Sequence, residues 1–351
     1  MNKNPAKFFV IVFLIAIIFY LSYSLLVSKN EKSKQLNRQK TNIIAMNFIK
    51  EKDVLKNKFE KEGGRKTIEF FNNQYIGVPD EVKHILEHYL GEELYLKEGA
   101  EGIKLCPDTL FSGCFHGFFA KAMSVEGEEF VKKAESVCGL RKDFFQASGC
   151  IHGIGHGFLT FKGYDNLNEA LKSCDRVSYS IPFGNEMCYT GVFMEYNLVT
   201  VYDKDGEKLM PRPFRKDKAF EPCINVFSSY QSACYLQLPQ WWSEVLKSDY
   251  AKMGSLCEMV NLKDNRESCF RSIGMVVVRE TSKDIDKINA YCKKMPVHEA
   301  VIFCLEEASK LMSVLKGANP MAPCRFLKSN EADKCISNVK IFMCEKMHKC
   351  D

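Results

Sequence analysis

Ser112-Gly-Cys-Phe-His-Gly117 recurs 36 residues later as Ser148-Gly-Cys-Ile-His-Gly153, with five of the six positions identical. A shorter version begins at Cys188 as Cys-Tyr-Thr-Gly. A period near 35 residues is typical of helix pairs stacked in an array, because each pair can bury its apolar side only against the next pair. The sequence therefore predicts an all-α fold, an α-solenoid of about seven helix pairs.

The sixteen cysteines follow the same period. Within the first seven consecutive pairs the gaps are 8 to 14 residues, and the first members step along the chain by 32 to 49 residues. No short C-x₂₋₄-C spacing of a zinc–thiolate site occurs, so we expect one disulfide in each helix pair and an oxidising compartment. In each unit the first helix should end at its cysteine, and the next cysteine should open the second helix. The predicted disulfides are Cys106–Cys114, Cys138–Cys150, Cys174–Cys188, Cys223–Cys234, Cys257–Cys269, Cys292–Cys304, Cys324–Cys335 and Cys344–Cys350.

An uncharged apolar run occupies residues 8–27. As a helix it is about 30 Å long, enough to cross a bilayer. We predict a single-pass transmembrane anchor, with residues 1–7 in the cytoplasm and the remainder extracytoplasmic. The lysines after the run favour the opposite orientation by charge alone, but a reducing compartment would leave the sixteen cysteines unpaired. A cleaved secretory signal is the alternative, because Ser22-Tyr-Ser24 is a small-x-small triplet.

A basic stem follows over residues 28–66. It holds twelve Lys or Arg against five Asp or Glu, a net charge of +7, whereas residues 67–351 carry a net −4 (the chain's +5, less 7, less 2 for residues 1–7). This placement fits anionic lipid headgroups and not nucleic acid. Residues 41–62 have an amphipathic pattern ended by Gly63-Gly64, which predicts a helix that serves as a stalk, lies on the membrane or self-associates.

The extracytoplasmic body is expected to begin with a leading helical segment over residues 67–105. Within it, Pro79-Asp80 opens a helix that should stop near Gly91. The cysteine-paired repeats then occupy residues 106–351, interrupted by a proline-rich insertion over residues 199–222.

Histidines concentrate at the start of the repeats. His152 and His156 are four residues apart, so on a helix both imidazoles share one face, and His116 holds the position of His152 one unit earlier. Glu195 of the next unit adds a carboxylate. This set predicts a divalent-metal site suited to zinc, iron or manganese. The alternative is structural: the glycines beside these histidines let backbones approach closely, and the imidazoles fill the seam.

His84-Ile-Leu-Glu-His88 matches the H-x-x-E-H arrangement of inverzincin metalloproteases, in which two histidines hold zinc and the glutamate activates water. Two other interpretations stay open. His84, Glu87 and His88 lie toward solvent on an ordinary amphipathic helix, or His84 and His88 face the same groove as His116 and His152. We assign no catalytic residue, and an enzymatic activity is less expected than its absence.

Residues 100–351 resemble disulfide-stapled, extracytoplasmic helical-repeat proteins of the tetratricopeptide-like class in unit length and helix–turn–helix order, although the tetratricopeptide signature residues are absent. The C-x-H-G-x-G-H stretch from Cys150 to His156 resembles one in secreted, uncharacterised microbial proteins. By analogy the resemblance implies a binding scaffold for a protein, a peptide or an envelope component. The alternatives are a metal-binding protein or metal-dependent enzyme centred on the histidines, and an envelope scaffold that self-associates through its stem.

Overall fold

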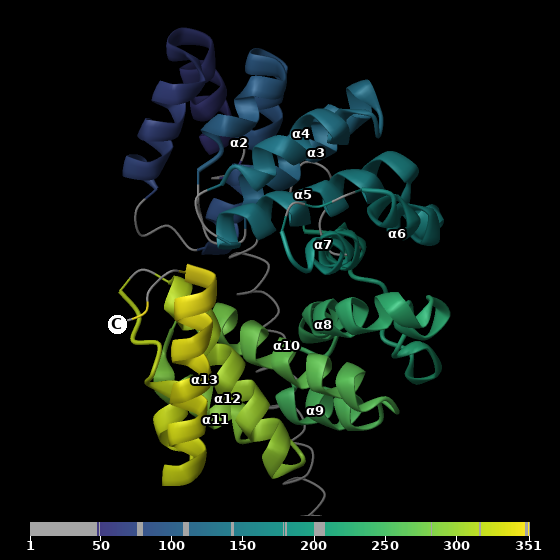
Figure 1. Cartoon of the computed structure of the whole chain (residues 1–351), viewed down its shortest axis with the longest axis vertical. Helices are drawn as coiled ribbons and strands as arrows, with labels where there is room; N and C mark the ends of the chain where they lie inside the picture. Colours follow the sequence, from purple (N-terminus) through teal and green to yellow (C-terminus); the bar gives the residue numbers. More distant parts are fainter. Residues whose placement is uncertain are drawn as a thin grey trace, which may run out of the picture. The chain divides into compact units, whose positions relative to one another are not determined.

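The described elements of this computed structural model are all helices, either α or 3-10 (Figure 1), which confirms the all-α prediction. The chain divides into two compact units, Met1–Glu51 and Lys52–Asp351, and the elements below belong to the second. No helix among the described residues is long and apolar enough to span a bilayer, and the predicted anchor over residues 8–27 lies outside them. The structure describes residues 48, 50–75, 80–107, 112–141, 144–177, 179, 181–199, 208–281, 283–315, 317–347 and 350.

Helical structure covers residues 50–74, on both sides of Gly63, whose φ of +77° is in the left-handed region. The part from Lys52 onward, which the sequence assigned to the stem, therefore lies within the second unit. Helix α2 (Asp80–Glu98) begins as expected but continues past Gly91. A Cβ at Gly91 would lie 1.9 Å from the carbonyl oxygen of Cys114, so this glycine permits helix contact and does not end the helix.

Seven helix–turn–helix units follow, each with its own disulfide. Four join two α-helices, and three have a 3-10 helix as the first member. The all-α units are α4 (Phe130–Gly139) with α5 (Phe144–Lys162), α6 (Leu167–Asp175) with α7 (Gly184–Val199), α9 (Tyr250–Glu258) with α10 (Lys263–Thr281), and α11 (Ile285–Cys292) with α12 (His298–Val314). The others are η1 (Gly99–Leu105) with α3 (Gly113–Glu126), η5 (Cys223–Asn225) with α8 (Ser228–Val245), and η6 (Pro323–Phe326) with α13 (Ser329–Met347).

All eight predicted disulfides are present. The second cysteine opens its helix in the first unit, where Cys114 follows Gly113 at the start of α3, but in the later units this detail of the prediction is wrong. Cys150 lies in the second turn of α5, which begins at Phe144, and Cys269 lies equally far into α10, which begins at Lys263. In these units the disulfide joins the end of the first helix to the second turn of the second helix. The loop between the two helices is therefore short.

The second helices of the units contact one another in chain order, from α3 through α5, α7, α8, α10 and α12 to α13 (Figure 1). The first helices pack against the second helix of their own unit and against that of the preceding unit, as α6 does with α7 and α5. Helix α13 also returns to α5, where the ring centroids of Phe342 and Phe145 are 5.4 Å apart and the Lys346 ammonium lies 4.4 Å from the Phe144 centroid. The inner side chains of α2, α3, α5 and α7 are thereby held within one helical array.

The insertion is fixed to α8 by two tryptophans. The Trp241 indole donates a hydrogen bond to the backbone carbonyl of Arg212 (3.2 Å), and the Trp242 indole donates one to that of Ala219 (3.0 Å). The Arg212 guanidinium lies 3.8 Å from the centroid of the Trp241 ring. Both tryptophans are buried, so they pack the insertion against the rest of the body.

Candidate metal centre

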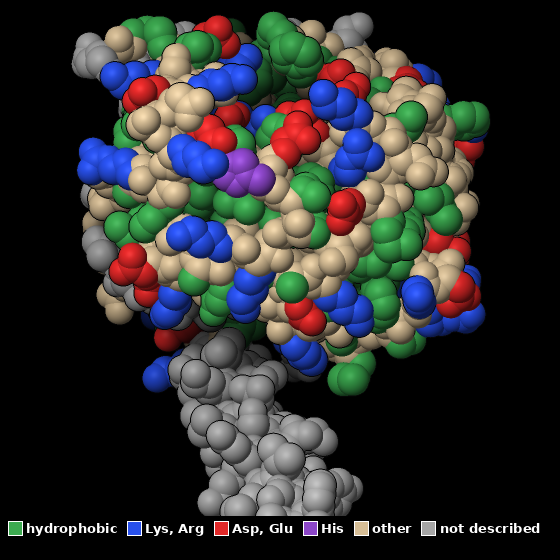
Figure 2. Space-filling view, turned by 90° about the horizontal axis from the view of Figure 1, so that it is seen from below, with side chains coloured by type: hydrophobic (Ala, Val, Ile, Leu, Met, Phe, Trp, Pro, Cys, Tyr) green, Lys and Arg blue, Asp and Glu red, His purple; other side chains and the backbone are tan. Residues whose placement is uncertain are grey.

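The surface and the interior of the body differ in their chemistry. On the face shown in Figure 2, basic and acidic side chains are interspersed with apolar ones, without an extended region of one sign. The histidines of the first repeats lie inside instead, where His116 is 1% exposed and His156 is fully buried. The candidate site is therefore an internal one.

Glycine contacts between helices bring the histidines together. A Cβ at Gly117 of α3 would lie 1.8 Å from the carbonyl oxygen of His88 on α2, and one at Gly191 of α7 would lie 1.9 Å from that of His152 on α5. Only glycine allows backbones to approach this closely. The close approach of helix backbones that the glycines predict is confirmed. It brings side chains at neighbouring positions of the two helices into contact.

The first group of donors comprises His84, His88 and His116. The Nε2 atom of His88 lies 3.1 Å from Nε2 of His84 and 3.1 Å from Nδ1 of His116. The three rings are mutually edge-on, with interplanar angles of 75°, 76° and 83° and centroids 4.7 to 5.1 Å apart. Two nitrogens bound to one tetrahedral zinc ion at about 2.0–2.1 Å would be about 3.3 Å apart, so these distances suit a shared ion.

The second group is built on His152 and His156, whose Nε2 atoms lie 3.2 Å apart. The Thr190 hydroxyl donates to the carbonyl of Met187 (2.7 Å), so it accepts from Nδ1 of His152 at 2.8 Å. The Glu195 carboxylate accepts from Nδ1 of His156 at 2.7 Å. In the neutral tautomer with its proton on Nδ1, an imidazole carries a lone pair on Nε2.

In that state the two Nε2 atoms, 3.2 Å apart, present lone pairs to each other, and these repel. A cation between them would remove the conflict. Burial is the main cause that holds the pKa of His152 well below its usual value, so its Nε2 atom keeps the lone pair. The thioether sulfur of Met194 lies 3.4 Å from His152 Nε2 and adds a soft donor at the same point.

Glu195 supplies negative charge to this group. Burial raises the pKa of its carboxyl, but hydrogen bonding to His156, the charge of that imidazole and the hydroxyl of Tyr164 together bring the pKa below its usual value. Tyr164 donates to the other carboxylate oxygen at 2.6 Å. The sequence proposed Glu195 as a ligand; its contact with Nδ1 of His156 matches the carboxylates that orient metal-binding histidines from behind.

His116 lies between the two groups. Its Nδ1 atom faces His88, and its Nε2 atom is buried without a hydrogen-bond partner among the described residues. Its ring stacks on that of His156, with centroids 3.8 Å apart and an interplanar angle of 14°. Donor atoms of His116, His152 and His156 lie within 4.8 Å of one another, as do those of His84, His88 and His116. The structure therefore brings all five predicted histidines together.

Four histidines of the cluster are held neutral, the form that binds metal. Burial is the main cause that lowers the pKa of His84, His116 and His152 well below the usual value, and it lowers the pKa of His88 to about 4. At neutral pH the ring nitrogens of these four residues are thus available as lone-pair donors or as N–H groups, without a charge to expel an incoming cation.

One interpretation of the H-x-x-E-H stretch is wrong. His84, Glu87 and His88 do not lie toward solvent, since Glu87 is 1% exposed and both histidines turn toward His116. Both faces of α2 are covered, which the apolar pattern of one face does not reveal. The arrangement in which His84 and His88 share a groove with His116 is the one observed, and the third donor beside them is an imidazole and not a glutamate.

Sequence reasoning missed Thr190, Met194 and Tyr164. A signal for Thr190 was present, because Cys188-Tyr-Thr-Gly191 aligns with Cys150-Ile-His-Gly153 and places Thr190 at the position of His152. Met194 lies one turn further along α7, so it follows from the same alignment once the helix is known. No pattern pointed to Tyr164.

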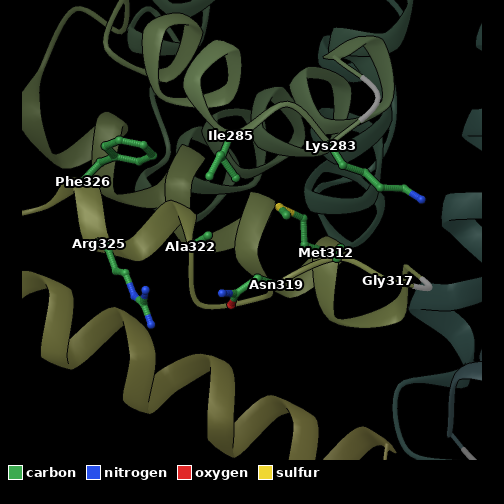
Figure 3. Close-up of a pocket in the computed structure, with 9 residues that line it drawn as sticks. Lys283, Ile285, Met312, Gly317, Asn319, Ala322, Arg325 and Phe326 are labelled. Carbon is green, nitrogen blue, oxygen red and sulfur yellow. The ribbon is translucent and has the colours of Figure 1, made fainter.

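A separate pocket of about 390 Å³ lies between the last units (Figure 3). Ile285, Ala322 and Met312 form its apolar wall, while Lys283 extends away from them (Figure 3). Among the described lining residues, Lys283 and Arg325 carry charge, and none is a histidine or a carboxylate. The pocket therefore lacks the donor groups that make the histidine cluster a candidate site.

No protein-family model, no curated protein and no solved structure matches this chain.

Proposed function

We propose that this protein binds a transition-metal ion between the Nε2 atoms of His152 and His156. The observation that carries the proposal is the pair of Nε2 atoms 3.2 Å apart, each on a ring whose Nδ1 atom is hydrogen-bonded on the opposite side. A metal ion between the two Nε2 atoms would form a coordinate bond with each of them.

Two further donors are available to complete the coordination. Met194 contributes a thioether 3.4 Å from His152 Nε2, and His116 Nε2 is buried and unpartnered. Because the rings of His116 and His156 are nearly parallel, His116 would have to tilt to share the ion. Imidazole and thioether ligands favour copper or zinc over magnesium and calcium, which prefer oxygen. The thioether favours copper(I) over the iron or manganese that the sequence also allowed.

The proposed role is metal capture or storage outside the cytoplasm. Eight disulfides indicate an oxidising environment, and they fix the helices that carry the donors. The full burial of His156 shields a bound ion from water. This favours retention of the ion over hydrolytic chemistry, which needs an open coordination position.

An equilibrium titration tests the proposal. The full-length chain, purified oxidised in detergent, is titrated with zinc and with copper(I) against chromophoric chelators. A His152→Gln/His156→Gln variant should lose an ion, because glutamine keeps the side-chain polarity and removes the ring nitrogens. His298→Gln is the matched control, since His298 is exposed and bonded to Glu331. Unchanged binding in the double variant would refute the site.

We also propose that the helix pairs form a solenoid anchored to the membrane by residues 8–27, with residues 28–51 as a basic stem that can self-associate. The chain-order contacts of the second helices support the repeat array. Resistance to alkaline extraction from membranes tests the anchor. Release of the protein into the soluble fraction would favour the cleaved signal instead.

The scaffold function remains a second proposal, favoured by exposed apolar side chains on and beside the insertion. Met210 is 91% exposed, and Leu209, Ile224 and Phe227 are also exposed. We propose that an apolar peptide or protein segment binds there. A Met210→Lys/Phe227→Lys variant should lose chemical cross-links to its partner in intact cells, whereas unchanged cross-linking would exclude this surface.

A further inference from the structure

We infer that the histidine cluster is a two-ion centre, with a second metal site formed by Nε2 of His84, Nε2 of His88 and Nδ1 of His116. This inference deepens the proposed function and rests on it for the first ion. The second site takes a borderline ion such as zinc, because it offers three imidazoles and no sulfur.

Hydrogen bonding cannot account for both contacts of His88 Nε2 at once. Nε2 of His88 lies 3.1 Å from both of its neighbours. A neutral ring nitrogen either donates one hydrogen bond or accepts one along its in-plane lone pair. At most one of the two contacts is therefore a good hydrogen bond in the apo protein. A single cation at the meeting point would satisfy all three atoms.

The ring orientations also suit a shared ion. Imidazoles bound to one tetrahedral ion point their nitrogens inward and keep their planes at steep angles to avoid each other. The three rings here are mutually edge-on, at 75°, 76° and 83°. His84 and His88 come from successive turns of α2, and His116 comes from α3, so the helix contact at Gly117 sets the spacing.

The two sites use different atoms, so both can be filled at once. The first site uses Nε2 of His152 and His156 with the Met194 sulfur, and the second uses His84, His88 and Nδ1 of His116. The donor sets also differ in softness, which separates the preferred ions. Copper(I) suits the site with the thioether, and zinc suits the site with three imidazoles.

Charge favours this division of ions. Glu195 is a carboxylate hydrogen-bonded to the cluster, and it lies behind His156 on the side of the first site. The carboxylate nearly neutralises the charge of a monovalent copper ion beside it. Such an ion therefore repels a neighbouring zinc ion less than a second divalent ion would.

The test counts metal ions in the full-length, oxidised protein and in two paired variants, after loading with zinc and copper(I) together and removal of loosely bound metal. We expect two ions per chain in the wild type. His84→Gln/His88→Gln should keep one copper and lose the zinc, and His152→Gln/His156→Gln should keep one zinc and lose the copper. His298→Gln should keep both. Titration of free thiols and circular dichroism verify that each variant is oxidised and folded.

Other outcomes separate the two proposals. One ion per chain, lost only in the His152/His156 variant, overturns the second site and leaves the proposed function intact. One ion lost only in the His84/His88 variant overturns the proposed first site and the two-ion centre. One ion lost in both variants means a single shared site and overturns the two-ion inference. A wild type without metal overturns both proposals. X-ray absorption at the zinc edge gives a second readout, in which three imidazoles and no sulfur are expected.

Discussion

Gly117 of α3 lies against the backbone of His88 on α2, where a Cβ would come within 1.8 Å of the His88 carbonyl oxygen. The same relationship recurs between Gly191 of α7 and His152 of α5 at 1.9 Å. In both pairs the residue before the glycine, His116 or Thr190, has a polar atom within 3.1 Å or 2.8 Å of a ring nitrogen of that histidine. Repetition of one glycine contact thus places both groups of donors.

Alanine at these glycines should separate the helices. For Gly117→Ala and Gly191→Ala we expect a loss of about 2 kcal/mol or more in the free energy of unfolding, because backbone atoms cannot yield as a side chain does. Urea unfolding followed by circular dichroism measures this loss. Ser124→Ala, at an exposed position of α3, should change it by less than about 0.5 kcal/mol. Equal stability of the glycine variants and this control would refute the packing argument.

Met194→Leu should reduce copper(I) affinity by roughly tenfold or more and leave zinc affinity nearly unchanged, because leucine keeps the volume and removes the sulfur. Competition with a copper(I)-specific chelator measures the first effect, and competition with a zinc indicator measures the second. Parallel losses for both metals would show that Met194 only packs against His152.

Thr190→Val should weaken metal binding at His152 by about 10- to 100-fold, because it removes the acceptor that fixes the ring tautomer. Thr190→Ser retains the hydroxyl and should bind as the wild type does. Titration of the three proteins with copper(I) provides the measurement. Wild-type affinity in the valine variant would mean that the hydrogen bond from His152 to Thr190 has no part in binding.

The apo protein should lose stability in acid. The pKa of His88 is lowered to about 4, from a usual 6.5, mainly by burial, so the unfolded chain binds more protons between these pH values. The contribution of His88 to the free energy of unfolding is therefore fully present above pH 6.5. It is lost as the pH drops toward 4, and the loss is about 3 kcal/mol for His88 alone. Urea midpoints of metal-free protein at pH 7, 5.5 and 4.5 test this. His88→Gln should flatten the profile, and a profile as steep as that of the wild type would contradict the assignment.

The disulfide between α6 and α7 should support the metal site as well as the fold. Replacing both Cys174 and Cys188 by serine opens a loop of 14 residues and should cost about 3 kcal/mol. It should also weaken copper binding, since α7 carries Thr190, Met194 and Glu195. Serine at Cys344 and Cys350, which close the tail, should leave metal affinity unchanged. Equal copper affinities in the two double variants would show that the Cys174–Cys188 disulfide does not support the metal site.

Sequence reasoning recovered what depends on local spacing. The cysteine period gave the disulfide pairs, because each pair closes one short connection, and the His152/His156 pair shares a face because four residues make about one helical turn. The end of α2 was misplaced at Gly91, since a glycine that permits helix contact looks the same in sequence as one that stops a helix. The division of the histidines into two groups depends on how far each helix slides past the next, which no local pattern records.

The metal content of the full-length chain, purified oxidised without chelators, decides whether His152 and His156 form a metal site. We expect close to stoichiometric copper or zinc in the wild type and in His298→Gln, with a loss of an ion in His152→Gln/His156→Gln. Wild-type and double-variant proteins that are folded, fully oxidised and equally metal-free after loading would refute the metal site. The facing nitrogens of His152 and His156 would then be a packing feature of the helix seam.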